Sequence, residues 1–309
     1  MKLILSNKDL SGYVFPEDVG VIYVSLKQLS AYNHNTDVVA IAGSRAMAIE
    51  AEKMDLPSLK LIQLTSAGFD GVPCEEYANR NVAVANAGTT YSVPIAETVV
   101  FGILFMTKKI RKNPNNRHFK LFRHYSTITE LDNKSALIMG AGNIGTAIAD
   151  RLRGFGIAID AYDPFCPEKP QYRNIIRDRE TLEAAIGEYD FVISTMPDNK
   201  TTRGFIDKKL FDKMSSRAVI VNVGRKAVFN NEDFYQSLKK KQIAGAVLDI
   251  FEKVPNPITN KFRRLSNVVV LPGVSAISQE VNDRLKQHIY KNLLAMLKDD
   301  MVLNVINGV

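Results

Sequence analysis

A glycine-rich turn gives the clearest chemical signal in the sequence. It reads Gly140-Ala141-Gly142-Asn143-Ile144-Gly145, directly after an apolar run over 136–139 and before a helix-compatible segment over 146–152. Glycines at this spacing permit a tight turn, close approach of the backbone to a pyrophosphate, and close packing of the following helix. The N-terminus of that helix would face the phosphates with its N–H groups and positive dipole end.

Asp163 adds the second part of this pattern, because it ends the next expected strand, eighteen positions beyond Gly145. A carboxylate at this place accepts hydrogen bonds from the hydroxyls of an adenine ribose and repels a 2′-phosphate. The alternative interpretation involves no ligand: a glycine-rich turn with Asp163 as a capping residue. Strand, turn, helix and acid together favour a dinucleotide site, and they favour NAD over NADP.

The elements that must position these residues form two series of short apolar runs separated by helix-compatible segments. The first series covers 3–5, 21–24, 38–42, 59–64 and 82–85. The second covers 136–139, 157–162, 191–195, 218–223, 244–250 and 268–271. This β/α rhythm predicts an α/β protein with two Rossmann-like, doubly wound domains.

Two longer helical segments stand out. The first spans 93–109 and is apolar on most faces; Ser92 is its expected cap, Pro94 its first turn, and Glu97 lies near its positive end. Such a helix is usually buried between domains or subunits, and we interpret residues 111–133 after it as an extended arm. The second is C-terminal, with one apolar stripe made of Ile277, Val281, Leu285, Ile289 and Leu293.

Composition bounds the remaining possibilities. The chain has 309 residues, 46% hydrophobic and 24% charged, which is ordinary for a globular protein of two domains. Its apolar runs fall short of a membrane span, and its two cysteines make neither a disulfide framework nor a metal site. Basic residues crowd 108–123 and contribute to a net charge of +7; we interpret them as a solvated surface without nucleic-acid binding. We expect a soluble, cytoplasmic protein.

Together with the glycine turn and Asp163, further motifs make the chain resemble the D-isomer-specific 2-hydroxyacid dehydrogenases. This family includes phosphoglycerate dehydrogenase and hydroxypyruvate reductase. Several motifs that follow one another along the chain carry the resemblance. They are Leu59-Lys60-Leu61-Ile62, Ser66-Ala67-Gly68-Phe69-Asp70, Ala96-Glu97, the glycine turn, Met196-Pro197, Thr202-Arg203-Gly204, Asn222-Val223-Gly224-Arg225 and Ala244-Gly245-Ala246-Val247-Leu248-Asp249. They cover nearly the whole chain.

The resemblance implies a split architecture. Residues 1–93 and 275–309 would form a flavodoxin-like substrate domain, and residues 94–274 the NAD-binding Rossmann domain, with the active site in the cleft. It also implies a homodimer, with the apolar helix in its interface. The implied reaction transfers a hydride between NAD and a small anionic 2-oxo or 2-hydroxy acid.

The resemblance assigns roles residue by residue. Ala67 and Gly68 match the loop that holds the substrate carboxylate through backbone N–H groups, and Arg225 matches the arginine that grips the carboxylate and the carbonyl oxygen. The matching cofactor positions are Gly140, Gly142, Asn143, Ile144 and Gly145 in the turn, Asp163, Thr195 and Met196 near the ribose, and Val223 and Asp249 near the nicotinamide.

Two family positions are changed. The proton-donating histidine is replaced by Gly273 and its partner glutamate by Val254, and Glu252 lies two residues too early to substitute. Loss of general acid help typically costs about 10²–10⁴ in rate. Other candidate donors are Tyr91, Lys226, His118 and His124, each of which also has an ordinary packing or surface interpretation.

Two hypotheses from different classes therefore stay open. The first is an NAD-dependent oxidoreductase with an unidentified proton donor or an unusual substrate. The second is a catalytically weak or inactive NAD-binding regulatory protein, since a fold does not by itself establish activity.

Overall fold

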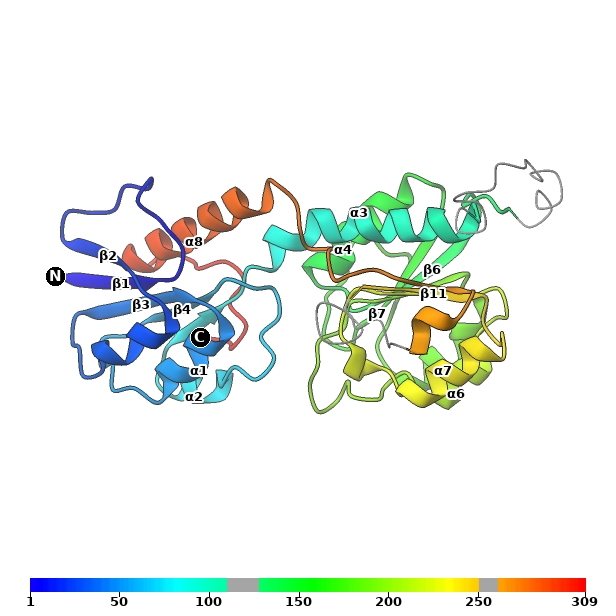
Figure 1. The fold of residues 1–309 in the computed structure, drawn as a ribbon, viewed down its shortest axis with the longest axis horizontal. Helices are drawn as coiled ribbons and strands as arrows, with labels where there is room; N and C mark the ends of the chain where they lie inside the picture. Colours follow the sequence, from blue (N-terminus) through cyan, green and yellow to red (C-terminus); the bar gives the residue numbers. More distant parts are fainter. Residues whose placement is uncertain (110–127, 250–260) are drawn as a thin grey trace. The chain divides into compact units, whose positions relative to one another are not determined.

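The structure is a computed structural model, and it describes residues 1–109, 128–249 and 261–309. Its chain divides into two compact units (Figure 1). The first combines Met1–Tyr91 with Ser278–Val309, and the second is Ser92–Ile277. Most of the expected arm over 111–133 lies outside the described residues, as do His118, His124, Glu252 and Val254.

The first unit is built on a five-stranded parallel sheet. Its strands are β1 (Lys2–Ser6), β2 (Val19–Tyr23), β3 (Val38–Gly43), β4 (Leu61–Leu64) and β5 (Ala83–Ala85). They lie in the order β2-β1-β3-β4-β5, and every pairing is parallel. This is the strand order of flavodoxin-like folds, so the structure confirms the α/β fold class and the five strands.

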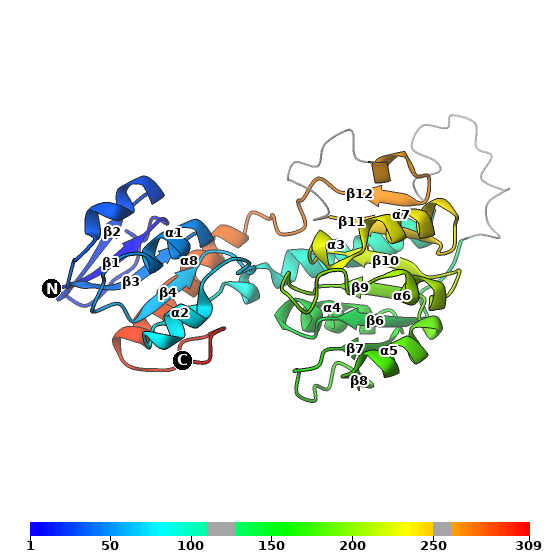
Figure 2. The ribbon, with the colours of Figure 1, turned by 90° about the horizontal axis from the view of Figure 1, so that it is seen from below.

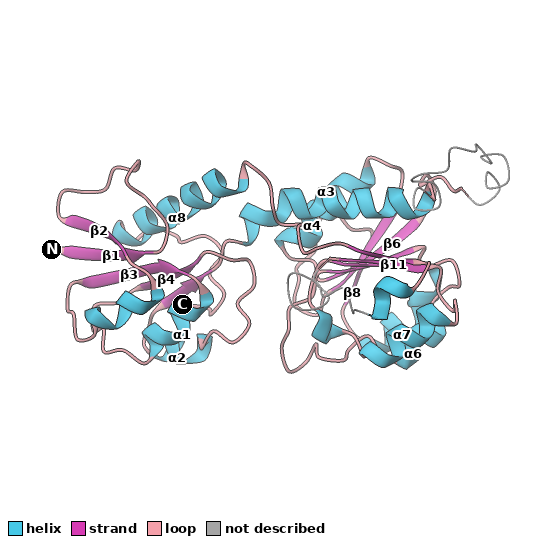
Figure 3. Cartoon of the chain, viewed as in Figure 1, coloured by secondary structure: helices cyan, strands magenta, loops and turns pink. Residues whose placement is uncertain are grey.

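Both faces of this sheet are covered (Figure 3). The helices are η1 (Leu26–Tyr32), α1 (Arg45–Glu52), α2 (Cys74–Asn79) and α8 (Val281–Leu297). Alternate strand residues point to opposite faces. Leu5 and Ile62 therefore pack with Met47 of α1, whereas Ile4 and Leu61 pack with Ile289 of α8. A helix from the far end of the chain thus completes the core of the first unit.

The second unit holds a seven-stranded parallel sheet. Its strands are β6 (Ser135–Met139), β7 (Ala158–Tyr162), β8 (Ile175–Ile176), β9 (Phe191–Ser194), β10 (Val219–Asn222), β11 (Gly245–Leu248) and β12 (Val268–Val270). Figure 2 shows them in the order β12-β11-β10-β9-β6-β7-β8. The order reverses at β6, which has β7 on one side and β9 on the other. Such a switch point is where doubly wound sheets bind ligands.

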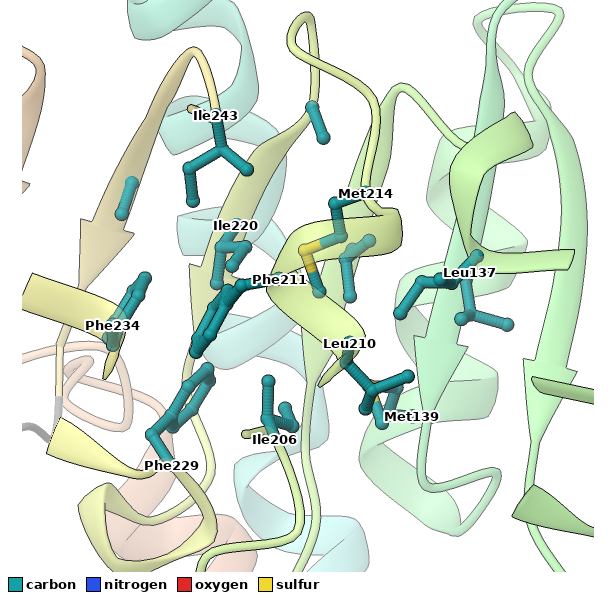
Figure 4. Packing of buried hydrophobic residues seen from close by; sticks show 14 of the residues in the cluster. Leu137, Met139, Ile206, Leu210, Phe211, Met214, Ile220, Phe229, Phe234 and Ile243 are labelled. Carbon is teal, nitrogen blue, oxygen red and sulfur yellow. The ribbon is translucent and has the colours of Figure 1, made fainter. Parts of the chain in front are cut away.

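Helices also cover both faces of this second sheet. They are α3 (Gly88–Thr107), α4 (Asn143–Arg153), α5 (Arg179–Ala185), α6 (Lys208–Lys213) and α7 (Asn231–Lys239), with short turns η5 (Ile186–Glu188), η6 (Lys226–Val228) and η7 (Lys261–Arg264). The larger core lies beneath α6 and α7 (Figure 4). There Phe234 stacks on Phe211 and Phe229, with ring centroids 5.4 and 4.8 Å apart.

The long apolar helix differs from the expectation at its start. We expected it over 93–109 with Ser92 as cap, but α3 begins at Gly88, so Ser92 and Pro94 lie inside it. The small and polar residues before Ser92 are compatible with a helix, and a proline in the second turn costs one backbone hydrogen bond without ending the helix. The expectation of Pro94 in the first turn was therefore wrong.

Contrary to the expectation that the apolar runs fall short of a membrane span, α3 is long and apolar enough to cross a membrane by length and composition alone. Core helices of soluble proteins meet the same test. Gly102 indicates how this helix packs: a Cβ there would lie 2.9 Å from Val247 Cγ1 of β11. The face of α3 that carries Gly102 therefore packs directly on the sheet.

The C-terminal helix is shorter than its apolar stripe. Ile277 is 70% exposed and lies before α8, so its assignment to the stripe was wrong. Val281, Leu285, Ile289 and Leu293 are buried, as expected.

Candidate active site

The predicted site residues of the second unit share one position in the fold. Gly140, Asp163, Thr195, Val223 and Asp249 each directly follow the last residue of a strand. The strands are parallel, so their carboxyl ends lie at one edge of the sheet. The fold therefore gathers residues separated by more than a hundred positions along the edge where such sheets bind ligands.

The glycine turn lies between β6 and α4, and each glycine meets a different demand. Gly140 has φ of 100°, a left-handed conformation that favours glycine. A Cβ on Gly145 would lie 2.1 Å from the Gly140 carbonyl oxygen, so a side chain there would force the helix off the strand. Gly142 faces open space, with no atom within 4 Å of a Cβ placed on it. The backbone is thus bare where a ligand would approach.

The start of α4 lies directly beside this open backbone. Gly142 is its N-cap, and Asn143 and Ile144 are its first two residues, the former exposed and the latter half-buried. N–H groups of a first helical turn have no acceptor within the helix, and the positive dipole end adds to their attraction for anions. The glycine turn and α4 therefore fit a dinucleotide pyrophosphate.

Asp163 is held by backbone donors. Its Oδ2 accepts a hydrogen bond of 2.9 Å from Ala141 N, which lies in the glycine turn. Its Oδ1 accepts from Phe165 N at 2.9 Å and Cys166 N at 3.1 Å. The acid therefore sits against the glycine turn, as the sequence pattern requires, and it also orders the loop that follows it.

Thr195 and Met196 close the other side of the turn. Thr195 Oγ1 donates to the Gly140 carbonyl at 2.8 Å, and Met196 is buried. A Cβ on Gly224 would lie 2.9 Å from the Met196 carbonyl oxygen, so the ends of β9 and β10 approach closely. Val223 is also buried, which makes it part of the packing at this edge.

Arg225 lies three residues after the end of β10 and is the N-cap residue of the short turn η6. Its side chain is half-buried, and its Nη1 donates to the Gly224 carbonyl at 3.4 Å. A guanidinium at the carboxyl edge can bind a carboxylate in two-pronged fashion and polarise an adjoining carbonyl. Lys226 follows it on the same turn and is likewise half-buried.

Asp249 is a buried acid at this edge. It is 1% exposed, and its Oδ1 accepts from Val274 N at 3.0 Å. Its Oδ2 accepts from the backbone N–H of Ser275 at 3.2 Å and from the Ser275 hydroxyl by a very short hydrogen bond. The segment 272–276, which the resemblance equates with the histidine-bearing loop, is therefore fastened to Asp249.

Gly273 gives this loop a conformation of its own. Its φ is 81°, in the left-handed region that residues with a Cβ adopt at a cost of about 1–2 kcal/mol. The loop thus has a conformation that favours glycine at the position where the resemblance predicts the proton-donating histidine.

Ala67 and Gly68 lie in the first unit, in the segment after β4. The Asn86 side chain donates to the Ala67 carbonyl at 3.0 Å, and Ser66 Oγ donates to the Gly68 carbonyl at 2.7 Å. Ala87 N donates to the Ser66 carbonyl at 3.0 Å. Three successive carbonyls are therefore tied by neighbouring groups, which fixes the turn from one side. These residues and those at the carboxyl edge of the second sheet belong to different units.

Tyr91, one candidate proton donor, is already engaged. Its hydroxyl donates to the Thr65 carbonyl at 2.5 Å, and burial raises its pKa above the usual value. Both features make the Tyr91 hydroxyl a poor proton donor.

Sequence reasoning missed several residues that shape these sites. They are Lys169 beside the glycine turn, Ser275 on Asp249, and Asn86 with His288 behind Ala67. Lys169 carried the only local signal, a cation six positions after Asp163. The others depend on segments that meet only in the folded chain.

Comparison with known proteins identifies the family. Residues 100–275, more than half of the chain, match the model of the D-isomer specific 2-hydroxyacid dehydrogenase NAD binding domain. The chain belongs to this family.

Its curated relatives include oxidoreductases of small acids. A glyoxylate reductase of Thermofilum pendens is 30% identical over 272 residues, covering 84% of this chain and 78% of the relative. A D-3-phosphoglycerate dehydrogenase of Archaeoglobus fulgidus is 27% identical over 263 residues, covering 85% of this chain and 49% of the relative.

Solved structures agree on the fold. An NADPH-dependent glyoxylate/hydroxypyruvate reductase of Sinorhizobium meliloti, in complex with NADP and malonate, has a TM-score of 0.75 at 22% identity and covers 99% of this chain and 96% of its own. Apo D-mandelate dehydrogenase of Rhodotorula graminis has a TM-score of 0.80 at 18% identity, with coverages of 100% and 98%. Family and relatives together support an NAD(P)-dependent 2-hydroxyacid reductase that binds a nicotinamide dinucleotide.

Proposed function

We propose that the second unit binds NAD or NADP along the carboxyl edge of its sheet, and that the protein reduces a small 2-oxo acid to the 2-hydroxy acid. The observation that carries this proposal is the glycine turn at the switch point, with Asp163 against it and Gly142 open. These residues fit a dinucleotide because they leave backbone N–H groups and a helix N-terminus accessible to a pyrophosphate. A bound nicotinamide supplies the hydride.

The chain's own residues then have separate tasks. Asn143 and Ile144 hold the pyrophosphate, Asp163 the adenine ribose, and Val223 and Asp249 shape the nicotinamide end. Arg225 binds the acid's carboxylate and polarises its carbonyl, which stabilises the charge that develops on oxygen. We assign the carboxylate-binding turn of Ala67 and Gly68 to the substrate domain, which corresponds to the first unit.

Reduction of a ketone also needs a proton for the oxygen. Gly273 has no side-chain proton to donate, and the Tyr91 hydroxyl already donates its proton to the Thr65 carbonyl in a hydrogen bond. Lys226 is the remaining described candidate, and replacing it with Met tests that role. A protonated 2-imino acid would need no acid, because hydride addition to its C=N carbon leaves the electron pair on a nitrogen that already carries its protons.

The first experiment measures oxidation of NADH and NADPH against glyoxylate, hydroxypyruvate, pyruvate and phosphohydroxypyruvate, each with and without ammonium. Nucleotide binding is followed by fluorescence in the same samples. Turnover of any of these acids supports the reductase, and turnover only with ammonium identifies an imine as the substrate. Binding without turnover removes the reductase proposal for these acids.

The second candidate function is an NAD-binding regulatory protein with little or no turnover. The left-handed Gly273, fastened by its neighbours to Asp249, favours it, because this loop is built without the family's proton donor. Tight nucleotide binding with no product from any acid, with or without ammonium, is the outcome that this function predicts.

We also propose that the protein is a cytoplasmic homodimer that uses α3 in its interface. Phe101 on α3 is 51% exposed, and its ring lies 5.7 Å from that of Phe105. A pair of phenylalanine rings at least partly open to solvent is the kind of apolar surface that a second copy would cover.

A further inference from the structure

Lys169 lies beside the glycine turn, on the loop between β7 and β8. Its Nζ donates a hydrogen bond of 2.7 Å to the Ala141 carbonyl and one of 3.1 Å to Thr146 Oγ1, in the first turn of α4. The side chain is half-buried. The ammonium group is therefore held at the start of α4, next to the backbone assigned to the dinucleotide.

Asp163 and Lys169 bind the same residue from opposite ends. Asp163 accepts from Ala141 N at 2.9 Å, while Lys169 donates to the Ala141 carbonyl at 2.7 Å. An acid and a cation thus bracket one residue of the glycine turn. The sequence pattern alone predicts only the negative charge of Asp163 at the adenine ribose. The structure adds the positive charge of Lys169 beside it.

The two charges are not equally available to a ligand. Asp163 spreads its charge over three backbone N–H donors, from Ala141, Phe165 and Cys166. Both partners of Lys169 are neutral oxygens, and within the described part of the chain no carboxylate oxygen lies within 4.0 Å of its Nζ. An ammonium held by neutral acceptors keeps its attraction for an anion.

The loop that carries Lys169 is anchored. Arg177 donates through Nη1 to the Cys166 carbonyl and through Nη2 to Glu168 Oε1 at 2.7 Å. Prolines at 164, 167 and 170 further restrict the backbone. The ammonium is therefore positioned before any ligand arrives, which lowers the entropy cost of binding.

We propose that Lys169 binds the 2′-phosphate of NADP, so that this chain accepts both NAD and NADP. The inference rests on the proposed dinucleotide site, and it revises the preference for NAD that Asp163 alone suggested. Asp163 serves the ribose hydroxyls of NAD, whereas Lys169 offsets the repulsion that the acid would exert on a 2′-phosphate.

The test is equilibrium binding of NADH and NADPH to four proteins: wild type, Lys169→Met, Lys169→Arg and Lys209→Met. Lys209 is an exposed lysine on α6 and controls for the loss of one positive charge. Because the chain has no tryptophan, the fluorescence of the nucleotide itself reports binding. Competition by ADP-ribose and by its 2′-phosphorylated form isolates the adenosine end.

The expected result is selective. Lys169→Met raises the Kd for NADPH and for 2′-phospho-ADP-ribose by about ten- to a hundred-fold, the range for losing a hydrogen bond to a charged group. The Kd for NADH changes little, Lys169→Arg retains NADPH binding, and Lys209→Met behaves as wild type. Asp163→Ala weakens NADH and reduces discrimination against NADPH.

Other outcomes overturn the inference in distinguishable ways. If Lys169→Met and Lys169→Arg weaken NADH and NADPH equally, Lys169 serves the pyrophosphate or the loop and not the 2′-phosphate. If wild type binds NADH but not NADPH, the inference fails while the dinucleotide site stands. If wild type binds neither nucleotide, the proposed function fails with it.

Discussion

His288 on α8 donates a hydrogen bond of 2.9 Å from Nε2 to the backbone carbonyl of Asn86. Asn86 in turn holds the Ala67 carbonyl through its side-chain amide. Asn292, one turn along α8, donates to Gln63 Oε1 at 2.6 Å. The C-terminal helix is thus linked by buried and half-buried polar groups to the turn proposed to bind the substrate carboxylate. This linkage lies within the first unit.

This linkage predicts a loss of stability in acid. Burial lowers the pKa of His288 below its ordinary value of 6.5, with nearby Lys291 adding to the effect. The unfolded chain then binds the proton at a higher pH than the folded chain, so the free energy of unfolding falls as pH drops below about 6.5. The fall stops once pH is below the folded pKa.

Urea unfolding between pH 7.5 and about 5 measures this effect. We expect His288→Gln to flatten the pH dependence relative to wild type. The exposed His34, in the same unit, provides the control variant His34→Gln, which should leave the dependence in place. An unchanged pH profile in His288→Gln would refute the assignment.

Arg225→Ala tests the substrate role of the guanidinium. We expect kcat/KM for the preferred 2-oxo acid to fall by about 10²–10³, the usual effect of removing a group that stabilises developing charge. The Kd for NADH should change little, because the proposed pyrophosphate and ribose contacts lie on other segments. Arg217→Ala is the control, since Arg217 precedes the same strand and pairs with Asp190 at 2.7 Å. Equal activity in both variants would remove Arg225 from the site.

Gly273 should resist replacement by the histidine that the resemblance predicts at this position. With φ of 81°, Gly273→Ala and Gly273→His should each lower the free energy of unfolding by about 1–2 kcal/mol. Gly12→Ala is the control, because a Cβ there meets nothing within 4 Å and its φ is not in the left-handed region. Denaturant midpoints give the comparison. A Gly273→His protein as stable as wild type would show that the loop readily adopts another conformation.

Ser275 should contribute to stability through Asp249. Ser275→Ala removes a hydroxyl that donates to a carboxylate 1% exposed, and we expect a cost of about 1–3 kcal/mol. Ser275→Thr keeps the hydroxyl and should recover part of that loss. The same unfolding measurements decide, and equal stabilities of the Ala and Thr variants would mean that the hydroxyl contributes nothing.

Phe101→Asp tests the proposed dimer. A charge on this exposed ring position of α3 should shift the mass measured by light scattering from dimer toward monomer. Phe155→Asp, at another partly exposed phenylalanine, should leave the mass unchanged. A monomeric wild-type protein would contradict the proposal directly.

The sequence predicted the sheets well because buried parallel strands are continuous apolar runs. The run over 218–223 became β10, and all eleven expected strands are present. Ile175–Ile176 escaped notice because two residues make no pattern, although their strand forms an edge of the sheet. The start of α3 was misplaced because Pro94 reads as a first-turn residue, whereas the helix accommodates it in its second turn.

The candidate site was predictable only where a motif is local. The glycine turn and Asp163 lie within one β/α/β unit, so their spacing implies their proximity, and the structure joins them through Ala141. Lys169, by contrast, meets Thr146 because the loop folds back over α4, and Ser275 meets Asp249 across the ends of two strands. No rule of sequence spacing predicts these two contacts, because each depends on how a loop folds back in the complete structure.

The late position of α8 has a consequence for synthesis on the ribosome. The first 91 residues emerge with one face of their sheet uncovered, because Leu285, Ile289 and Leu293 are made almost two hundred residues later. The second unit is contiguous and can complete its core first. The nascent N-terminal segment therefore exposes an apolar surface throughout most of translation, which makes it the part of the chain most in need of a chaperone.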